Sequence, residues 1–323
     1  MSAPVCSTAV RAPRALELIG APSDCGANLA GACGGPQALR AAGLVPALRA
    51  LGLQVHDGGD LRGPARPAHS TGTGMDIRTG CHHLAQVLAW NRRVYRAVAA
   101  ALSAGRVPVL LGGDHSLAIG SISAVAQHCQ AQGLRLRVLW VDAHADANTP
   151  ATSPSGNLHG MPVASLCGLG PQALIEMSGA VPALPASAFC QIGLRSVDMY
   201  EKHMIRQLGL HVFDMRAIDE LGMREVMRRA LADLGPNDHL HVSFDVDFLD
   251  PDIAPGTGTP VRGGPNYREA QLCMEMVADT GRMASLDIVE INPAYDTHNR
   301  TAELAVDLVE SLFGKSTLMR RRG

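Results

Sequence analysis

The 323-residue sequence is poor in aromatic residues, in excess charge of one sign and in long apolar runs. Aromatic residues make up only 3% of the chain, too few for platforms on which bases or sugars stack. Lys and Arg number 28 against 30 Asp and Glu, so the net charge of −2 lacks the basic surplus of nucleic-acid-binding proteins. No apolar run approaches the ~18 residues of a membrane-spanning helix. We therefore expect a soluble, cytoplasmic protein that uses neither nucleic acid nor membrane as a partner.

Paired cysteine motifs are also missing. Eight cysteines are scattered along the chain and none belongs to a Cys-x-x-Cys motif, which predicts reduced, mostly buried thiols rather than a disulfide framework. The run Cys81-His82-His83 has metal-binding residue types but no further ligands nearby, so we predict no metal site there. Residues 1–14 contain no continuous apolar segment, and they predict no signal peptide.

Short apolar segments alternate with helical patterns along the chain. Most of the apolar segments are continuously hydrophobic, which is typical of strands that are covered on both faces. Eight strands are expected at residues 16–19, 53–56, 107–111, 136–141, 189–194, 210–213, 240–244 and 286–290. Helices are expected at residues 36–48, 83–102, 117–130, 200–208, 224–234, 267–279 and 301–313.

This alternation predicts an α/β fold with a mostly parallel sheet of about eight strands flanked by helices. No internal repeat or change in composition divides the chain, so we expect a single domain over residues 1–323, with residues 1–14 and 315–323 as flexible or subunit-contact ends. Loops rich in Gly, Pro, Ser and Thr follow several strands. Because ligand sites of open α/β sheets lie at the carboxyl ends of strands, these loops are predicted to surround the site.

Acidic residues and histidines follow three of the expected strands. In extended backbone every second side chain points to the same side, so residues spaced by two are expected to converge at these strand ends. Crowded carboxylates raise one another's pKa unless cations compensate them. Carboxylates and imidazoles without a thiolate are typical ligands of divalent first-row metals such as Mn²⁺. We therefore predict a binuclear metal site with the ligands His115, Asp142, His144, Asp146, Asp245 and Asp247.

Each motif also has a purely structural alternative. An isolated Asp-x-His-x-Asp or Asp-x-Asp pattern is common where a strand end meets water, and Gly-Gly-Asp-His fits a turn in which Asp114 caps a helix. The metal interpretation depends on the coincidence of all three patterns at strand ends of one chain.

Longer motifs around these residues resemble those of the ureohydrolase family, and within it those of the arginases, over about residues 21–313. The family's fold, a three-layer α/β/α sandwich around a parallel sheet, agrees with the pattern above. In the family, the six predicted ligands hold two Mn²⁺ ions, although the same ligand types also suit Co²⁺, Ni²⁺ or Fe²⁺. The motifs are GGDHSLAIG (112–120), DAHADANTP (142–150), SGNLHGMPV (155–163), SFDVDFLDP (243–251), GTGTP (256–260) and DIVEINP (287–293).

The resemblance implies hydrolysis of the guanidinium group of L-arginine to L-ornithine and urea by a metal-bridging hydroxide. Guanidinium is a poor electrophile, and two metals ~3.5–4 Å apart lower the pKa of a shared water enough for attack near neutral pH. By resemblance, Asp146 orients the hydroxide, Glu290 pairs with the guanidinium and His159 protonates the leaving amine. The structural alternatives are a surface acid for Glu290 and an ordinary loop histidine for His159.

Residues farther from the metals are expected to select the substrate. By resemblance, the polar loop at residues 148–157 favours a substrate with an α-carboxylate, which agmatine lacks, whereas a Ser/Thr/Asn cluster taken alone is only a generic loop. The resemblance assigns the α-carboxylate to Asn148, Ser153, Ser155 and Asn157, the α-amino group to Asp198 with Glu201, and the neighbourhood of the guanidinium to Thr259.

Three positions depart from the family pattern. Ser196 stands where many arginases have a second acid, so recognition of the α-amino group is expected to depend more on Asp198. Phe248 stands where others have glycine and is expected either to narrow the pocket or simply to pack, and Leu29 replaces a common arginine.

Other functions compete with this interpretation. Agmatinases and guanidino-acid hydrolases belong to the same family, and a deacetylase on a related fold would use one Zn²⁺ and would not need His115. A non-enzymatic arginine sensor or scaffold would have no physical reason to keep all six ligands together with Glu290 and His159. The resemblance further implies a homotrimer or homohexamer and a role in arginine metabolism such as the urea cycle.

Overall fold

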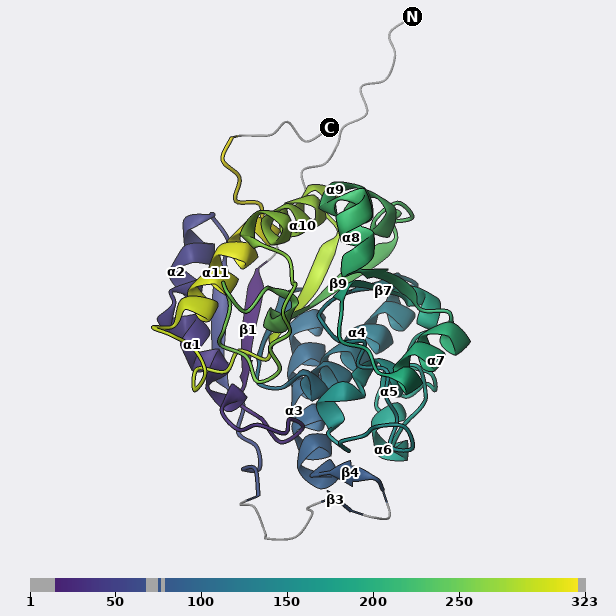
Figure 1. Ribbon diagram of the computed structural model, residues 1–323. Coiled ribbons are helices and arrows are strands. Elements are labelled where there is room, and N and C mark those ends of the chain that lie inside the picture. Colours follow the sequence, from purple (N-terminus) through teal and green to yellow (C-terminus); the bar gives the residue numbers. More distant parts are fainter. Residues whose placement is uncertain (1–14, 68–74, 77–78, 319–323) are drawn as a thin grey trace, which may run out of the picture.

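The computed structural model describes residues 15–67, 75–76 and 79–318, and its centre is one eight-stranded sheet (Figure 1). Neighbouring strands are all parallel, in the order β2-β1-β5-β10-β9-β6-β7-β8, which confirms the predicted sheet. A separate antiparallel pair consists of β3 (Met75–Asp76) and β4 (Cys81–His82). The strands of the large sheet are β1 (Leu16–Ala21), β2 (Val55–Asp60), β5 (Val107–Gly112), β6 (Arg135–Val141), β7 (Phe189–Leu194), β8 (His211–Asp214), β9 (Asp238–Asp245) and β10 (Met283–Val289).

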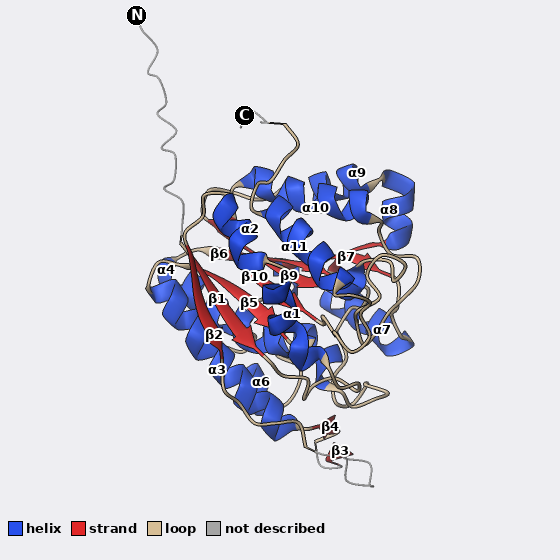
Figure 2. Cartoon of the chain, turned by 90° about the vertical axis from the view of Figure 1, so that its left-hand side faces the viewer, coloured by secondary structure: helices blue, strands red, loops and turns tan. Residues whose placement is uncertain are grey.

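Helices cover both faces of the sheet and bury one apolar core on each face, which makes the three predicted layers (Figure 2). One face is covered by α1 (Gly35–Ala41), α2 (Leu44–Ala50), α8 (Met215–Leu221), α9 (Met223–Ala230), α10 (Tyr267–Thr280) and α11 (Arg300–Leu312). The other face is covered by α3 (Leu84–Ser103), α4 (Ala118–Gln132), α5 (Pro162–Leu166), α6 (Gln172–Ile175) and α7 (Met199–Leu208). Short 3₁₀ helices are η1 (Ala32–Gly34), η2 (His115–Leu117), η3 (Leu158–Gly160), η4 (Ala186–Ala188) and η5 (Val246–Phe248).

Most elements lie where the sequence predicts them, but the helix expected at residues 36–48 is wrong. It is divided into α1 and α2 because Gly43 adopts a φ of +88°, a left-handed conformation in which glycine carries no steric penalty. The short helices α5, α6 and α8 were not predicted, since segments of four to seven residues are too short to show a clear helical period.

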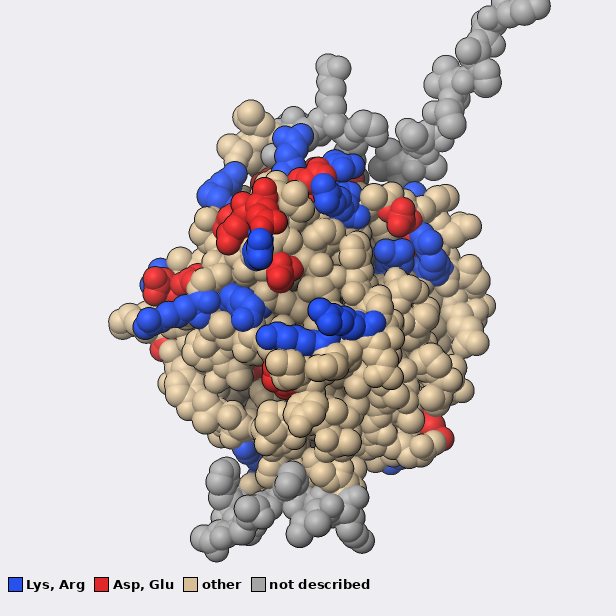
Figure 3. Space-filling model, turned by 45° about the vertical axis from the view of Figure 1, so that its right-hand side comes forward, with Lys and Arg blue, Asp and Glu red and all other residues tan. Residues whose placement is uncertain are grey.

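Charged side chains of both signs lie on the surface, in agreement with the nearly balanced charge of the sequence. Acidic and basic side chains are interspersed on the face shown in Figure 3, and Glu225 on α9, for example, forms ion pairs with Arg228 and Arg229.

Within the described residues, no helix combines the length and apolarity needed to cross a bilayer. Of the two ends expected to be flexible or to contact a subunit, residues 1–14 and 319–323 lie outside the described residues. The described cysteines are all free, as predicted.

Candidate metal centre and active site

Four neighbouring strands at the centre of the sheet lead to the candidate site. The order β5-β10-β9-β6 puts their carboxyl ends side by side, and these ends lead to His115, Glu290, Asp245 and Asp142 respectively. The pairing of Val289 with Asp245 shows that β10 and β9 end at the same level. Residues separated by up to 175 positions in the chain therefore meet at one edge of the sheet.

The first metal-binding group surrounds the Nδ1 atom of His115. Carboxylate oxygens of Asp142, Asp245 and Asp146 lie 3.0, 3.1 and 3.2 Å from this nitrogen. The nitrogen is buried, yet it makes no well-directed hydrogen bond to the residues that the structure describes. A single N–H cannot satisfy three acceptors at once, whereas a divalent cation binds nitrogen and oxygen ligands from several directions. These residues therefore fit a metal ion.

The second metal-binding group shares Asp142 with the first. The Nδ1 atom of His144 lies 3.0 Å from Oδ2 of Asp247 and 3.5 Å from Oδ1 of Asp142, whose other oxygen faces His115. In each group of three, the ligand atoms all lie within 4.8 Å of one another. A shared carboxylate between two nitrogen and oxygen clusters is the arrangement expected of a binuclear metal site.

The charges in this cluster shift one another's pKa strongly. Burial, reinforced by the charge of Asp142, raises the pKa of Asp146 to about 6, and burial next to Asp247 also raises the pKa of Asp245. Burial disfavours a charged His144, but Asp247 and Asp142 outweigh it and raise its pKa to about 12. Protons on the imidazoles thus balance the acids, and bound metal ions would replace these protons.

Two side chains that were not predicted orient the ligands. The Nε2 atom of His115 lies 2.8 Å from Oγ of Ser243, and its ring stacks on Trp140 with a centroid distance of 4.1 Å. Trp140 also donates a 2.9 Å hydrogen bond from Nε1 to Oδ2 of Asp142. Each of the two precedes a ligand (Asp142 or Asp245) by two residues on a strand. Strand alternation, which puts every second side chain on one face, is therefore the sequence signal that could have found them.

The backbone around two acids differs from the extended form that the sequence analysis assumed. Residues 142–146 do converge, but β6 has already ended, and Asp146 has a φ of +49°. Glu290 likewise has a φ of +62°. Such left-handed conformations cost about 1–3 kcal/mol each and persist only where the surroundings fix them. Hydrogen bonds from the N–H of Val163 to the carbonyl of Asp146 (2.9 Å) and from the N–H of Glu290 to the carbonyl of Gly113 (2.7 Å) fix them here.

The Gly-Gly-Asp-His turn satisfies both interpretations of its sequence. Asp114 caps η2 by accepting a 3.0 Å hydrogen bond from the N–H of Ser116, as the structural alternative predicted. The same turn directs His115 into the metal cluster. Gly113 cannot carry a side chain, because a Cβ atom would lie 1.8 Å from the carbonyl oxygen of Ser23.

Glu290 and His159 form a buried pair beside the cluster. The Nδ1 atom of His159 lies 3.0 Å from Oε1 of Glu290, which also accepts a 2.8 Å hydrogen bond from the backbone N–H of His115. Burial disfavours a charged His159, but Glu290 raises its pKa to about 9. Burial alone would raise the pKa of Glu290, and His159 instead lowers it. Both groups are therefore charged at neutral pH, and Glu290, at 2% exposure, is not a surface acid.

A cavity of about 200 Å³ opens onto this cluster. Of the predicted site residues, Asp142 and Asn157 are buried next to it without lining it. The structure therefore brings together all the other predicted residues around one small cavity. The cavity is lined by His115, His144, Asp146, Asn148, Ser153, Pro154, Ser155, His159, Gly160, Ser196, Asp198, Glu201, Asp245, Asp247, Thr259 and Glu290.

Comparison with known proteins identifies the family. A model of the arginase family matches residues 14–314. The chain belongs to this family. It is 42% identical to the arginase of Brevibacillus brevis over 304 residues, which cover 94% of this chain and 99% of that protein. Its structure is similar to that of Bacillus caldovelox arginase (TM-score 0.87, 41% identity, 94% and 100% coverage) and of Entamoeba histolytica arginase in complex with L-ornithine (0.83, 30%, 94% and 99%).

The outer end of the cavity in this arginase-family chain offers hydrogen-bond donors from short side chains. The Oγ atoms of Ser153 and Ser155 accept hydrogen bonds from backbone N–H groups of residues 156 (2.9 Å) and 157 (3.3 Å). A hydroxyl that accepts a bond still has its proton to donate. Asn148 gives one amide hydrogen to Oδ2 of Asp198 (2.7 Å) and keeps the other.

Two acids at the start of α7 face these donors. Asp198 and Glu201 form a capping box, in which Oδ1 of Asp198 accepts from the N–H of Glu201 (2.9 Å) and Oε2 of Glu201 accepts from the N–H of Asp198 (3.1 Å). Burial raises the pKa of Glu201 to about 7, although the N–H of Asp198 opposes it. On the metal side, Thr259 donates a 3.0 Å hydrogen bond to Oδ2 of Asp247.

Arg195, which follows β7, supports the metal-binding segment although no sequence motif points to it. Its guanidinium donates to the carbonyl oxygens of Asp247 (2.7 Å), Phe248 (3.0 Å), Leu249 (3.1 Å) and Val261 (2.8 Å). One side chain therefore joins the segment that carries Asp247 to the loop after Thr259. No local sequence pattern signals this role, because these four partners are backbone groups more than 50 residues away.

The three departures from the family pattern have different surroundings. Ser196 lines the cavity and its backbone pairs with His144. Phe248 is fully buried, and its ring fills the space where a side chain at Gly193 would otherwise lie, so it packs rather than narrows the pocket. Leu29 is exposed and does not line the cavity.

Proposed function

We propose that this member of the arginase family hydrolyses L-arginine at its guanidinium group to give L-ornithine and urea. One observation carries the proposal: a single cavity of about 200 Å³ has a binuclear metal-binding cluster at its inner end and both hydrogen-bond donors and carboxylates at its outer end. Arginine presents a guanidinium at one end and an α-carboxylate with an α-amino group at the other. The cavity is complementary to both ends.

The metals in this proposal are two Mn²⁺ ions, since nitrogen and oxygen donors without thiolate suit such cations, as they would Co²⁺, Ni²⁺ or Fe²⁺. Four aspartates carry the charge needed to balance two divalent cations. When bound, the pair would supply a water molecule activated for attack near neutral pH. The proposed ligands are His115, Asp142, His144, Asp146, Asp245 and Asp247.

Glu290 is proposed to hold the guanidinium. The Oε1 atom of Glu290 accepts a hydrogen bond from the backbone N–H of His115 and lies next to His159. The Oε2 atom accepts no hydrogen bond from the described residues, and Glu290 lines the cavity. A carboxylate oxygen in this position accepts a guanidinium N–H in a charge-assisted hydrogen bond. Asp146, on the same cavity wall, is proposed to orient the attacking water.

His159 is proposed to supply the proton for the leaving group. As water oxygen bonds to the guanidinium carbon, the bond from that carbon to the δ-nitrogen breaks, and this nitrogen needs a proton to leave as an amine. His159 lines the cavity and, with a pKa of about 9, carries that proton at neutral pH. Glu290 keeps the ring in position through Nδ1.

The outer end of the cavity supports arginine over agmatine. The free donors of Asn148, Ser153 and Ser155 are proposed to hold the α-carboxylate, with Asn157 behind them. The carboxylates of Asp198 and Glu201 are proposed to hold the α-ammonium group, and Thr259 lies nearest the guanidinium end. Agmatine has no carboxylate to occupy the donors.

A three-substrate assay tests this proposal. Urea release is measured from arginine, agmatine and 4-guanidinobutyrate on protein whose metal content is determined in the same sample. We expect arginine to be preferred by at least ~100-fold in kcat/KM. Agmatine lacks the α-carboxylate and 4-guanidinobutyrate lacks the α-ammonium group, so each leaves polar groups at the outer end of the cavity without a partner. Preference for agmatine or guanidinobutyrate would assign the chain to another ureohydrolase activity. Absence of urea from all three at full metal content would reject the proposal.

The oligomeric state, the location and the metabolic role complete the proposal. We propose a cytoplasmic homotrimer or homohexamer of a single-domain chain, acting in arginine metabolism such as the urea cycle. The family resemblance supports these features. Light scattering coupled to gel filtration tests the oligomeric state, and a monomer at working concentration would contradict it.

A further inference from the structure

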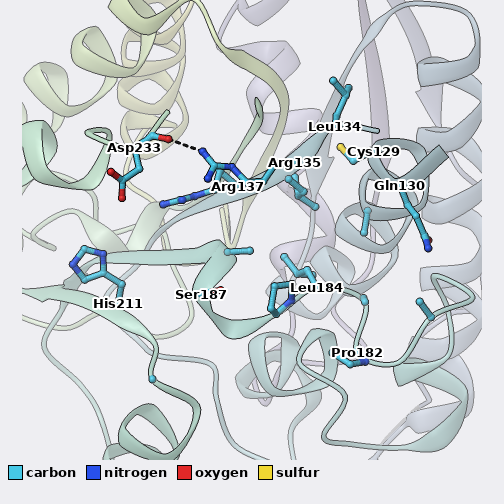
Figure 4. Close-up of a pocket in the computed structure, with 17 residues that line it drawn as sticks. Cys129, Gln130, Leu134, Arg135, Arg137, Pro182, Leu184, Ser187, His211 and Asp233 are labelled. Carbon is cyan, nitrogen blue, oxygen red and sulfur yellow. Dashed lines mark hydrogen bonds between the residues drawn. The ribbon is translucent and has the colours of Figure 1, made fainter. Parts of the chain in front are cut away.

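A second cavity, of about 750 Å³, lies at the opposite edge of the sheet, at the amino-terminal ends of β6, β7 and β8 (Figure 4). It exists because these strands start at different levels. β6 begins at Arg135, whereas β7 first pairs with it where Phe189 lies opposite Val138, and β8 begins with His211 opposite Cys190. The first three residues of β6 thus have no strand beside them on that side. We call this cavity the amino-edge recess.

One half of the amino-edge recess contains the guanidinium of Arg137, which makes no hydrogen bond to the described residues. Arg137 is half-buried, and among the described residues none accepts a hydrogen bond from it or forms an ion pair with it. Its neighbour Arg135, by contrast, makes two hydrogen bonds to Asp238 (2.7 and 2.5 Å) and one to the carbonyl of Asp233 (2.6 Å). Figure 4 shows Arg137, His211 and Asp233 on the same side of the recess. Asp233 is exposed to water, so its carboxylate stays solvated.

The other half of the amino-edge recess is apolar. It is formed by the end of α4, the residues that follow it and the loop before β7, including Cys129, Leu134, Pro182 and Leu184, which Figure 4 shows opposite the charged side chains. The division follows from strand alternation. Leu136 packs into the core beneath α4, so its neighbour Arg137 points to the opposite face of the sheet.

These two halves have consequences for what the amino-edge recess can hold. The Arg137 guanidinium has N–H donors that no described residue accepts, and a planar guanidinium forms parallel hydrogen bonds to a carboxylate. The volume lies within the ~300–1,000 Å³ that is typical of small-molecule sites. We propose that the amino-edge recess binds a small amphipathic carboxylate, with its anionic head on Arg137 and its apolar body against Leu134 and Leu184.

Calorimetric titration of the intact, metal-loaded protein with 4-phenylbutyrate tests this site. The acid should bind, and its uncharged amide should bind at least ~10-fold more weakly because it loses the charge-assisted pairing. Acetate, which has the head without the body, should also bind at least ~10-fold more weakly because it buries little apolar surface. Arg137→Gln should weaken binding of the acid at least ~10-fold, whereas the matched control Arg92→Gln on α3 should not.

A second set of variants separates this site from the active-site cavity. Ser153→Ala alters the proposed carboxylate contacts of the active site and should leave phenylbutyrate binding unchanged, as should removal of the metals. Equal binding of acid and amide, unchanged binding by Arg137→Gln, or no heat up to about 10 mM ligand would overturn the proposal. Loss of the oligomer in Arg137→Gln without phenylbutyrate binding would instead assign the amino-edge recess to a subunit contact. None of these failures bears on arginine hydrolysis.

Discussion

The two ends of the active-site cavity are built in different ways. At the inner end, buried side chains from adjacent strand ends converge on one point, and Nδ1 of His115 alone has three carboxylates around it. At the outer end, a loop at residues 148–157 and the start of α7 present short polar groups whose local hydrogen bonds leave donors free. The inner end therefore has a geometry that needs cations, whereas the outer end has one that needs a polar ligand. Substitutions at the inner end should therefore change metal binding or turnover, whereas substitutions at the outer end should mainly change KM for arginine.

The largest effect is expected where both metal-binding groups meet. Asp142→Asn removes the charge that the two groups share, so it should lower the binding of both metals and reduce kcat/KM by more than ~10³-fold. Elemental analysis combined with the urea assay measures this. Asp219→Asn, an exposed acid on α8, is the matched control. Two retained metals and unchanged activity in Asp142→Asn would contradict a shared ligand.

A smaller loss, with the metals kept, is expected at the proposed proton donor, His159. His159→Asn should lower kcat by about 10²–10⁴-fold, because a positioned acid contributes a factor of that size. Metal content should stay near that of the wild type, since no ligand is changed. This combination separates His159 from the metal cluster that it borders. Unchanged kcat would remove His159 from the reaction.

Arg195 tests whether the inner end depends on support from its backbone. Arg195→Met keeps much of the side-chain length but removes the hydrogen bonds to the carbonyls around Asp247, so metal affinity should fall by about 10–100-fold. Competition with a metal chelator measures the affinity without reference to turnover. Saturating metal should restore most of the activity if Arg195 acts by positioning. An unchanged affinity would show that Asp247 needs no such support.

The pH dependence of metal binding sharpens the same comparison. With a pKa of about 12, His144 is protonated in the metal-free fold at neutral pH, and it must lose this proton before it binds a metal. Metal binding therefore releases protons, and affinity should rise by about tenfold per pH unit for each proton released. Calorimetry in buffers with different ionisation enthalpies counts these protons. A pH-independent affinity would contradict the cluster described here.

The smallest effect is expected at the outer end. Ser153→Ala removes one free donor, so kcat/KM for arginine should fall by about tenfold, mostly through KM, while the slow reaction with agmatine stays unchanged. Ser187→Ala, an exposed serine at the other edge of the sheet, serves as control. An equal loss of kcat/KM with arginine and with agmatine would show that Ser153 does not bind the α-carboxylate.

Much of the fold and the metal cluster could be predicted from the sequence because strands and strand ends leave local signals. Continuous apolar runs locate most of the strands, and Asp-x-His-x-Asp after β6 locates half of the cluster. The exception is β2 (Val55–Asp60), a polar strand at the edge of the sheet that shares only two residues with the expected segment 53–56. Gly43 is a position where the sequence pattern misleads. The helical spacing of apolar residues continues through it, and only its left-handed backbone divides the helix into α1 and α2. The spacing of apolar residues reports which side chains share a face, but it does not report a backbone conformation that ends a helix.

Contacts between residues that are distant in sequence could not be predicted from local patterns. Arg195 bonds to carbonyl oxygens, which every residue has, so its partners carry no sequence signature. The left-handed φ of Asp146 is fixed by a hydrogen bond from Val163, which lies in another segment. Trp140 and Ser243 are different, because alternation along β6 and β9 already predicts that they lie beneath the ligands.

We propose that the carboxyl ends of the central strands assemble a binuclear metal site around Asp142. Anomalous diffraction from crystals of the Mn²⁺-loaded protein tests it most directly. We expect two metal peaks about 3.5–4 Å apart on either side of the Asp142 carboxylate. A single peak, or two peaks that bind separate groups of acids without Asp142, would contradict it.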